Sequence, residues 1–436
     1  MAREPQPKSL KRNPILHFEM PECADCSGNN SRENNDVLHR PPAGLRPEPK
    51  SLRIRPMPAR LRHFVLTLGF ALLSSGIARA ATPAGDPVKI GFFMSVTGRD
   101  ASFGEAALRG ARLAIDDLNA AGGILGRPAE LIVEDNRSLA GESATAAKKL
   151  IGRDKVIALV GECASSRTLE AAPVAQLAGV PLVTPASTNP RVTAVGDSIF
   201  RVCFADPFQG AVLATYAWKT LGLRRAALLI DASASYSVGL AEVFAKTFTA
   251  LGGEIVASQK YAGGDKDFRA QLTAIRATRA DAIFLPGYYV EAGLAAQQSR
   301  ELGLHATLLG GDGFEAPQLL EIGGPALEGT VYSTHYSAES AAPASRRFVT
   351  AYTARHGSAP VGLAALTYDA VNLIADAARR AGSTERSALK QALAATRDFP
   401  GVTGRTTLDE NRDALKDAAI IAVRGGRCVF VESIRP

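Results

Sequence analysis

Short β-branched runs alternate with longer amphipathic stretches along most of the chain, and this alternation occurs in two series. In the first series, strand-like runs at 88–95, 131–134, 156–160 and 180–184 are separated by helical patterns at 104–121, 142–152 and 165–178. The second series begins after Asp206-Pro207, with strands at 226–231, 254–258, 281–285 and 306–310 and helices at 208–221, 238–251, 267–277 and 290–302. Such alternation is typical of parallel sheets covered by helices on both faces. The two series therefore predict two α/β lobes.

The remaining segments extend these lobes. Helical patterns follow at 345–356, 364–381 and 385–395, and two final runs at 418–424 and 427–433 read as a β-hairpin closed by Gly425-Gly426. No low-complexity linker separates the two series, so we expect a close hinge. Because open α/β sheets bind ligands at the carboxyl ends of their strands, the cleft between the lobes is the expected site.

Residues 57–80 have the three parts of a secretory signal peptide. Arg60 and Arg62 provide the positive start, Phe64 to Leu73 is an apolar run, and Ala78-Arg79-Ala80 offers small residues to a signal peptidase. The run is shorter than the ~20 apolar residues that cross a bilayer. We therefore expect export to the periplasm.

The segment before this signal peptide is rich in Pro, Arg, Asn and Glu and has no apolar period of either kind. Met57 is the expected start of translation, so that residues 1–56 are either not translated or form a disordered leader. The mature chain is expected to begin near Ala81.

Charge gives no reason to expect nucleic acid or a membrane surface as a partner. Residues 1–80 hold 13 of the 50 Lys and Arg but only 7 of the 43 Asp and Glu, so the mature chain is close to neutral.

The mature chain also lacks the residue patterns of an enzyme. Its histidines have no metal-ligand spacing, and it has no nucleophile elbow and no phosphate-binding glycine loop after a strand. We expect no enzymatic activity, no cofactor and no metal. The three remaining cysteines fit either one disulfide with a free thiol or three free thiols: Cys163, Cys203 and Cys428.

Hydroxyl side chains follow two neighbouring predicted strands of the first series. Ser165 and Ser166 open a helix after one strand, and Ser187 and Thr188 lie in a loop after the next. A helix N-terminus with hydroxyl donors suits a carboxylate. An ordinary serine N-cap or a polar turn explains either loop taken alone.

The second series offers complementary groups at the ends of its strands. Tyr288 and Tyr289 present aromatic faces with a polar tip, and Asp312 provides a negative charge. A carboxylate-binding loop on one lobe opposite an aspartate on the other is the arrangement that a zwitterion needs.

Four segments carry a resemblance to a known family. They are Val88-Lys-Ile-Gly-Phe-Phe-Met-Ser-Val-Thr-Gly98, Gly110-Ala-Arg-Leu-Ala-Ile-Asp-Asp-Leu-Asn-Ala-Ala-Gly-Gly-Ile124, Gly179-Val-Pro-Leu-Val-Thr-Pro-Ala-Ser-Thr-Asn-Pro190 and Pro286-Gly-Tyr-Tyr-Val-Glu291. With them, nearly all of residues 86–433 resembles the periplasmic branched-chain amino-acid (Leu/Ile/Val) binding proteins, the substrate-binding components of ABC importers.

The resemblance implies an α/β fold of the type I periplasmic binding protein class, with two doubly wound lobes joined by a three-crossing hinge. Lobe 1 would hold residues 86–205 and 335–417, and lobe 2 residues 206–334 and 418–436. The implied function is that of an extracytoplasmic receptor, which binds a small amino acid in the cleft and delivers it to permease and ATPase subunits. Alternatives within the fold are a receptor for an amide, urea-like or aromatic-acid ligand, and a secreted sensor.

The resemblance also assigns roles to residues. Ser165 and Thr188 would hold the ligand α-carboxylate, while Thr188, the Ser187 carbonyl and Asp312 would meet the α-ammonium. Tyr236 and Tyr289 would close over the ligand. The complete expected set is Phe103, Ser165, Ser166, Ser187, Thr188, Tyr236, Tyr289 and Asp312.

Two of these positions depart from the family pattern, which often has Tyr at Phe103 and Glu at Asp312. Asp is one methylene shorter and reaches less far toward an ammonium group. Arg167, beside the carboxylate loop, is expected to face solvent, with pairing to a second ligand carboxylate as the alternative. These departures leave the identity of the ligand open.

Overall fold

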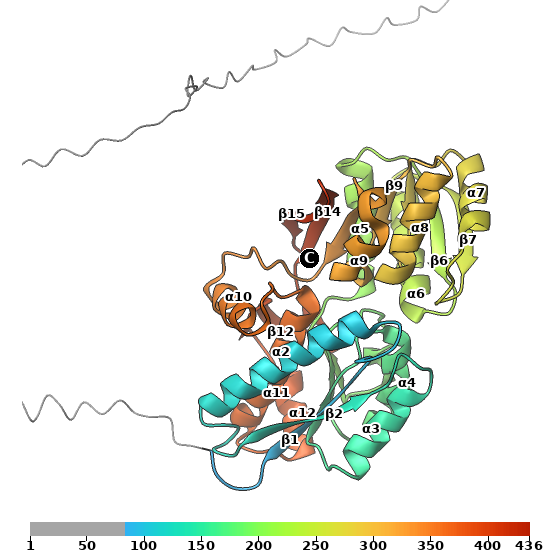
Figure 1. Ribbon diagram of the computed structural model, residues 1–436. Coiled ribbons are helices and arrows are strands. Elements are labelled where there is room, and N and C mark those ends of the chain that lie inside the picture. Colours follow the sequence, from blue (N-terminus) through green and yellow to red (C-terminus); the bar gives the residue numbers. More distant parts are fainter. Residues whose placement is uncertain (1–82) are drawn as a thin grey trace, which may run out of the picture. The chain divides into compact units, whose positions relative to one another are not determined.

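The computed structural model describes residues 83–436 (Figure 1). The expected leader (1–56), the expected signal peptide (57–80) and the expected mature start near Ala81 lie outside the described residues.

The first sheet has five strands, all parallel, in the spatial order β2-β1-β3-β4-β5. The strands are β1 (Val88–Met94), β2 (Ala129–Asp135), β3 (Ala158–Val160), β4 (Leu182–Thr184) and β5 (Ile199–Arg201). The helices of this part are α2 (Ala101–Ala120), α3 (Glu142–Gly152), α4 (Ser165–Leu177), α10 (Pro343–His356), α11 (Gly362–Ala381) and α12 (Arg386–Ala394). We call this sheet with its helices lobe 1.

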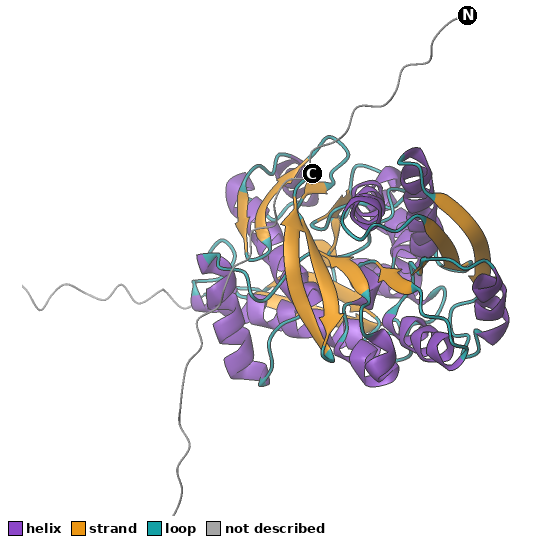
Figure 2. Ribbon diagram, turned by 90° about the horizontal axis from the view of Figure 1, so that it is seen from above, coloured by secondary structure: helices purple, strands orange, loops and turns teal. Residues whose placement is uncertain are grey.

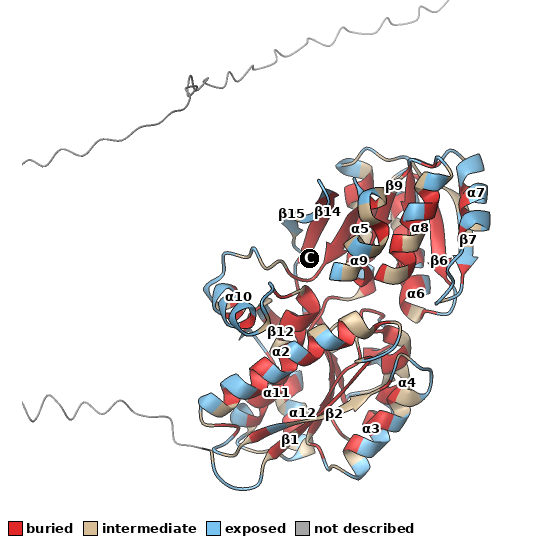
Figure 3. Ribbon diagram, in the orientation of Figure 1, coloured by how far each residue is buried: buried red, intermediate tan, exposed pale blue. Residues whose placement is uncertain are grey.

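Helices cover both faces of the lobe 1 sheet. Successive side chains of a strand point to opposite faces, and here the side chains on both faces are apolar and must be buried. Phe92 is buried in a cluster with residues of α2 and α11, whereas Phe93 is buried in a cluster with residues of α3 and α4. In Figure 3 the strands are mostly buried, and the helices are exposed on their outer sides.

The second sheet has seven strands in the order β15-β14-β10-β9-β8-β6-β7. Five are parallel: β6 (Arg225–Asp231), β7 (Glu254–Tyr261), β8 (Ala282–Phe284), β9 (Thr307–Gly310) and β10 (Val331–Thr334). An antiparallel hairpin of β14 (Ala418–Arg424) and β15 (Arg427–Ile434) extends the sheet beside β10. The helices of this part are α5 (Asp206–Lys219), α6 (Ser235–Ala250), α7 (Arg269–Ala277), α8 (Tyr289–Glu301) and α9 (Pro317–Gly323). We call this sheet with its helices lobe 2, and Figure 2 shows helices packed around the strands.

The parallel strands of both lobes share one doubly wound order, in which the second strand lies outside the first and the third strand lies on its other side. The order reverses between β1 and β3 and again between β6 and β8, and ligands of such sheets bind at the carboxyl ends of the strands near these points. The chain passes between the lobes after β5, after β10 and before β14. The residue boundaries of the lobes given above stay a prediction.

The main differences from the sequence analysis are short elements that it did not predict. β5, β10 and a small antiparallel sheet of β11 (Phe399–Gly401), β12 (Gly404–Leu408) and β13 (Ala414–Leu415) have only two to five residues each. They contain few consecutive apolar residues, whereas the equally short β3 and β8 lie in longer apolar runs. None of the described helices has the length and apolar character needed to span a bilayer.

Candidate functional site

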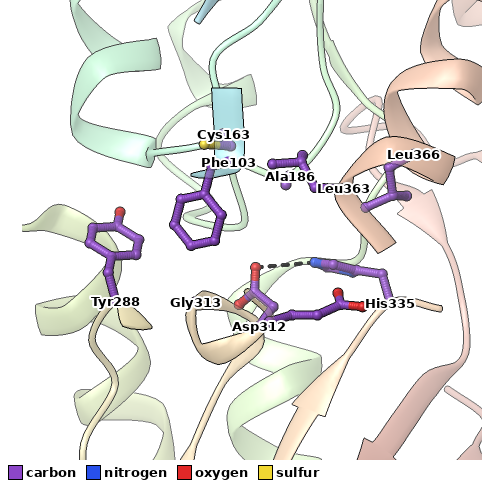
Figure 4. A pocket seen from close by; sticks show the side chains of 10 residues that line it. Phe103, Cys163, Ala186, Tyr288, Asp312, Gly313, His335, Leu363 and Leu366 are labelled. Atoms are coloured by element: carbon purple, nitrogen blue, oxygen red, sulfur yellow. Dashed lines mark hydrogen bonds and ion pairs between the residues drawn. The ribbon is translucent and has the colours of Figure 1, made fainter. Parts of the chain in front are cut away.

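A pocket lies between the carboxyl ends of strands from the two lobes (Figure 4). The empty space in and around it, including open solvent at its mouth, is about 360 Å³. Lobe 1 and lobe 2 both contribute to its walls, which are formed by Phe103, Cys163, Ala186, Tyr288, Asp312, Gly313, Glu315, His335, Leu363 and Leu366.

Asp312 follows β9 and begins a short 3-10 helix that ends at Phe314. One carboxylate oxygen, Oδ1, accepts a hydrogen bond of 2.9 Å from Gln209 Nε2 on α5, and Oδ2 lies 3.2 Å from His335 Nε2. In Figure 4 the Asp312 carboxylate and the His335 ring lie together at the floor of the pocket, opposite Phe103. No Lys or Arg is among the ten residues that line this pocket, so its polar wall is acidic.

Thr188 lies in the loop after β4 and is fully buried. Its hydroxyl lies beside the carboxylate of Asp206, and within the described residues neither group makes a hydrogen bond of good geometry. The Asp206 N–H donates to the Thr188 carbonyl at 2.9 Å. Burial, with a smaller contribution from the charge of Asp312, raises the pKa of Asp206 to about 8 against the lowering effects of Thr188 and Arg201. The Thr188 hydroxyl and the Asp206 carboxylate are therefore buried polar groups near Asp312 whose hydrogen-bonding capacity is not fully used.

Ser165 and Ser166 are the first two residues of α4. The N-cap residue is Ala164, and no side chain caps this helix. The alternative explanation, an ordinary serine N-cap, is therefore wrong. The Ser165 hydroxyl accepts a hydrogen bond from the Asn189 N–H at 3.2 Å. The Ser166 hydroxyl accepts one from the Ser235 N–H of lobe 2 at 2.9 Å. The first N–H groups of α4 therefore have no capping side chain.

The loop that carries Thr188 is held from behind by Arg201, which is fully buried. The Arg201 guanidinium donates to the carbonyl oxygens of Ser187 at 2.7 Å and Asn189 at 2.9 Å, and its Nε pairs with Asp413 at 2.6 Å. The Ser187 hydroxyl is itself engaged, since it donates to the Glu162 carbonyl at 2.8 Å. Ser187 thus shapes the loop through its side chain and does not line the pocket.

The aromatic residues of the site form one packed group. Phe103 lines the pocket and makes edge contacts with Tyr288 and Tyr289, at ring distances of 5.8 and 5.0 Å. Tyr288 lines the pocket and Tyr289 does not, because the Tyr289 hydroxyl donates to the Arg99 carbonyl of lobe 1 at 3.0 Å. Tyr236 stacks behind Tyr288 at 5.6 Å, and its hydroxyl accepts the Gly313 N–H at 3.3 Å.

The expectation that Arg167 faces solvent is wrong. Arg167 is only 7% exposed and is paired with two buried carboxylates, those of Asp100 and Glu162. An arginine with two acidic partners is already neutralised, and this is the physical reason for its burial.

Of the expected site residues, Phe103 and Asp312 line the pocket, and six are not among its lining residues: Ser165, Ser166, Ser187, Thr188, Tyr236 and Tyr289. Sequence analysis did not select His335, because β10 before it was not predicted. Glu315 was also missed; it directly follows the short 3-10 helix of Asp312–Phe314. The cysteines of the described residues are free thiols, and Cys163 lies in the pocket wall.

Comparison with known proteins identifies the family. Residues 87–427 match the model of the family described as periplasmic binding protein. An amino acid binding protein of Pseudomonas aeruginosa is 35% identical over 317 residues, which cover 72% of this chain and 84% of that protein.

Two solved structures are similar over the same region. The leucine-binding protein LivK of Thermotoga maritima has 41% identity and a TM-score of 0.78, covering 80% of this chain and 99% of that one. The branched-chain amino acid transporter substrate-binding protein LivJ of Streptococcus pneumoniae, in complex with isoleucine, has 35% identity and a TM-score of 0.77, covering 80% and 100%. These relatives are binding proteins rather than enzymes. The chain therefore belongs to the periplasmic binding protein family.

Proposed function

We propose that this protein is the extracytoplasmic receptor of an ABC importer and binds a small amino acid between its lobes. The observation that carries the proposal is the Asp312 carboxylate. It lies in a largely apolar pocket, and its contacts are an amide and a histidine ring. A carboxylate in such a place is costly unless a cation pairs with it. The α-ammonium group of an amino acid supplies that cation.

The ligand carboxylate would bind on lobe 1. The uncapped N-terminus of α4 offers N–H groups at Ser165 and Ser166, and its dipole favours a negative group. Thr188 adds a buried hydroxyl that makes no hydrogen bond of good geometry within the described residues. With Asp312 on lobe 2, the two charged ends of an amino acid would contact different lobes.

Closure of the lobes around the ligand would be the signal to the importer. Polar contacts already join the lobes around the pocket, including Asn189 Nδ2 to the Ser235 carbonyl at 2.7 Å and the Tyr289 hydroxyl to the Arg99 carbonyl. A ligand that contacts both lobes binds the closed form better and shifts the population toward it. We propose that residues 86–205 and 335–417 move as one lobe against 206–334 and 418–436, and that permease and ATPase subunits recognise the closed form.

The proposed receptor works in the periplasm after cleavage near Ala81. N-terminal sequencing of exported protein tests this part, and a mature protein that still starts at or before Met57 would refute it.

A thermal-shift screen of the mature protein against amino acids, amides, urea-like compounds and aromatic acids tests the ligand class. A true ligand at 100 times its dissociation constant adds about 2.7 kcal/mol to the free energy of unfolding. We expect amino acids to stabilise the protein and Asp312→Asn to weaken their binding strongly, while amine-free analogues are affected little. If the best ligand lacks an amine and binds Asp312→Asn equally well, the amino-acid assignment fails.

A further inference from the structure

The pocket contains a second carboxylate, that of Glu315, whose contacts differ from those of Asp312. Glu315 Oε1 accepts the Gly362 N–H at 2.8 Å, and Oε2 accepts the Thr334 hydroxyl. Gly362 is the first residue of α11, so Glu315 reaches from lobe 2 to lobe 1 beside Leu363. The two acids therefore have different partners, since Asp312 is held by Gln209 and His335.

One α-ammonium group does not balance both acids. His335 is the one basic side chain that lines the pocket, and it is next to Asp312. Arg167 is paired with Asp100 and Glu162, which balance its charge, and its Nη1 has no hydrogen-bond partner among the described residues. The positive end of α11 compensates the Glu315 charge in part, but no cation of the described residues pairs with it.

The carboxylate of Glu315 also has capacity for more hydrogen bonds. Each oxygen has two lone pairs, and the contacts from Gly362 and Thr334 use one on each. Burial raises the pKa of Glu315 to about 7, with the charge of Asp312 adding to the effect. A donor from the ligand would stabilise the ionised form of this group. The neighbouring walls at Leu363 and Leu366 are apolar, so the donor would come at the end or edge of a short side chain.

We propose that Glu315 selects amino acids whose side chain carries an O–H or N–H donor over their aliphatic isosteres. This inference rests on the proposed amino-acid receptor function and names the class of ligand within it. A hydrogen bond to a charged acceptor is about twice as strong as one between neutral groups. The threonine hydroxyl or asparagine amide would make such a bond, whereas valine and leucine of the same shape would leave the carboxylate without it.

Isothermal titration of the mature protein with the pairs threonine and valine, and asparagine and leucine, tests the inference. We expect the donor-bearing member of at least one pair to bind about tenfold more tightly or better, from the 1.5–3 kcal/mol of a hydrogen bond to a charged group. Glu315→Gln should reduce that ratio to about threefold or less. Asp312→Asn, the matched change of the other acid, should weaken both members of a pair by similar factors and keep their ratio.

The alternative role for Glu315 is a contact between the lobes that acts on every ligand equally. In that case Glu315→Gln lowers the affinities of both members of each pair by one common factor, and the inference is refuted. A wild-type preference for valine and leucine refutes it as well. Glu315→Leu, which removes the acceptor altogether, should abolish the preference, and circular dichroism checks its fold. If none of the four amino acids binds and no other does in the screen, the proposed function itself has failed, which is a different result.

Discussion

Replacing Arg201 by Met is expected to lower the free energy of unfolding by about 3–5 kcal/mol, the usual cost of breaking a buried ion pair by removing one partner. Arg201 is fully buried and binds the Asp413 carboxylate, the Ser187 and Asn189 carbonyls and the Thr193 hydroxyl. Each carbonyl left without a donor costs about 1–3 kcal/mol, and the total is not a simple sum because the loop can relax. Urea unfolding followed by circular dichroism measures the change.

The matched control is Arg355→Met, which removes a pair with Asp116 whose two side chains are about half exposed. Such exposed pairs contribute about 0–1 kcal/mol. Arg201→Lys keeps the charge but not the planar set of donors, so we expect it to fold and to bind the ligand more weakly, because the Thr188 loop loses its support. If Arg201→Met changes the free energy of unfolding no more than Arg355→Met, the argument that Arg201 holds this loop is wrong.

Three further changes test other parts of the site. Thr188→Ala should weaken ligand binding about tenfold or more in calorimetry, since it removes a hydroxyl placed for a charged group, and a loss below threefold would count against that role. Asp206 has a folded-state pKa of about 8 against about 3.9 when unfolded, so the stability from its neutral form is present at low pH and lost as the pH rises toward 8. Wild type should therefore lose stability relative to Asp206→Asn from about pH 4 to about pH 8 and change little above that, and a constant difference across this range would contradict it. Glu291→Gln weakens a 3.7 Å contact with Arg99 between the lobes and should lower the affinity for all ligands alike, by a few fold; unequal effects would place Glu291 in ligand selection instead.

The alternation of short and long periods predicts two α/β lobes with parallel sheets covered by helices, and the family resemblance implies their doubly wound fold. A strand such as β1 (Val88–Met94) is buried on both faces and bounded by turn residues, so it leaves a strong signal. β5 and β10 leave none, because each has only two adjacent large apolar residues, whereas the equally short β3 and β8 lie in longer apolar runs. Their positions follow from pairing with distant strands, which a local pattern does not encode.

The site was harder to predict for a related reason. Sequence places Tyr288 and Tyr289 at the same strand end, but the choice between them depends on the Arg99 carbonyl across the cleft, which takes the Tyr289 hydroxyl. The burial of Arg167 likewise depends on Asp100, which is 67 residues away in the chain. Contacts of this kind arise from tertiary packing, and helical position alone predicted the wrong exposure.

The pairing of the buried arginines bears on how the receptor would bind and release its ligand. The charge of Arg167 is balanced by Asp100 and Glu162, and that of Arg201 by Asp413. A ligand carboxylate at Thr188 would therefore meet mainly the neutral donors of the Thr188 hydroxyl and the α4 N-terminus. Neutral donors hold a carboxylate less strongly than a free arginine does. Neither half of the cleft would then bind an amino acid tightly alone, and most of the affinity would depend on contact with both lobes. A ligand can shift a conformational equilibrium only by the difference between its affinities for the two forms. Keeping the arginines paired therefore favours tight binding in the closed form and release when the lobes separate.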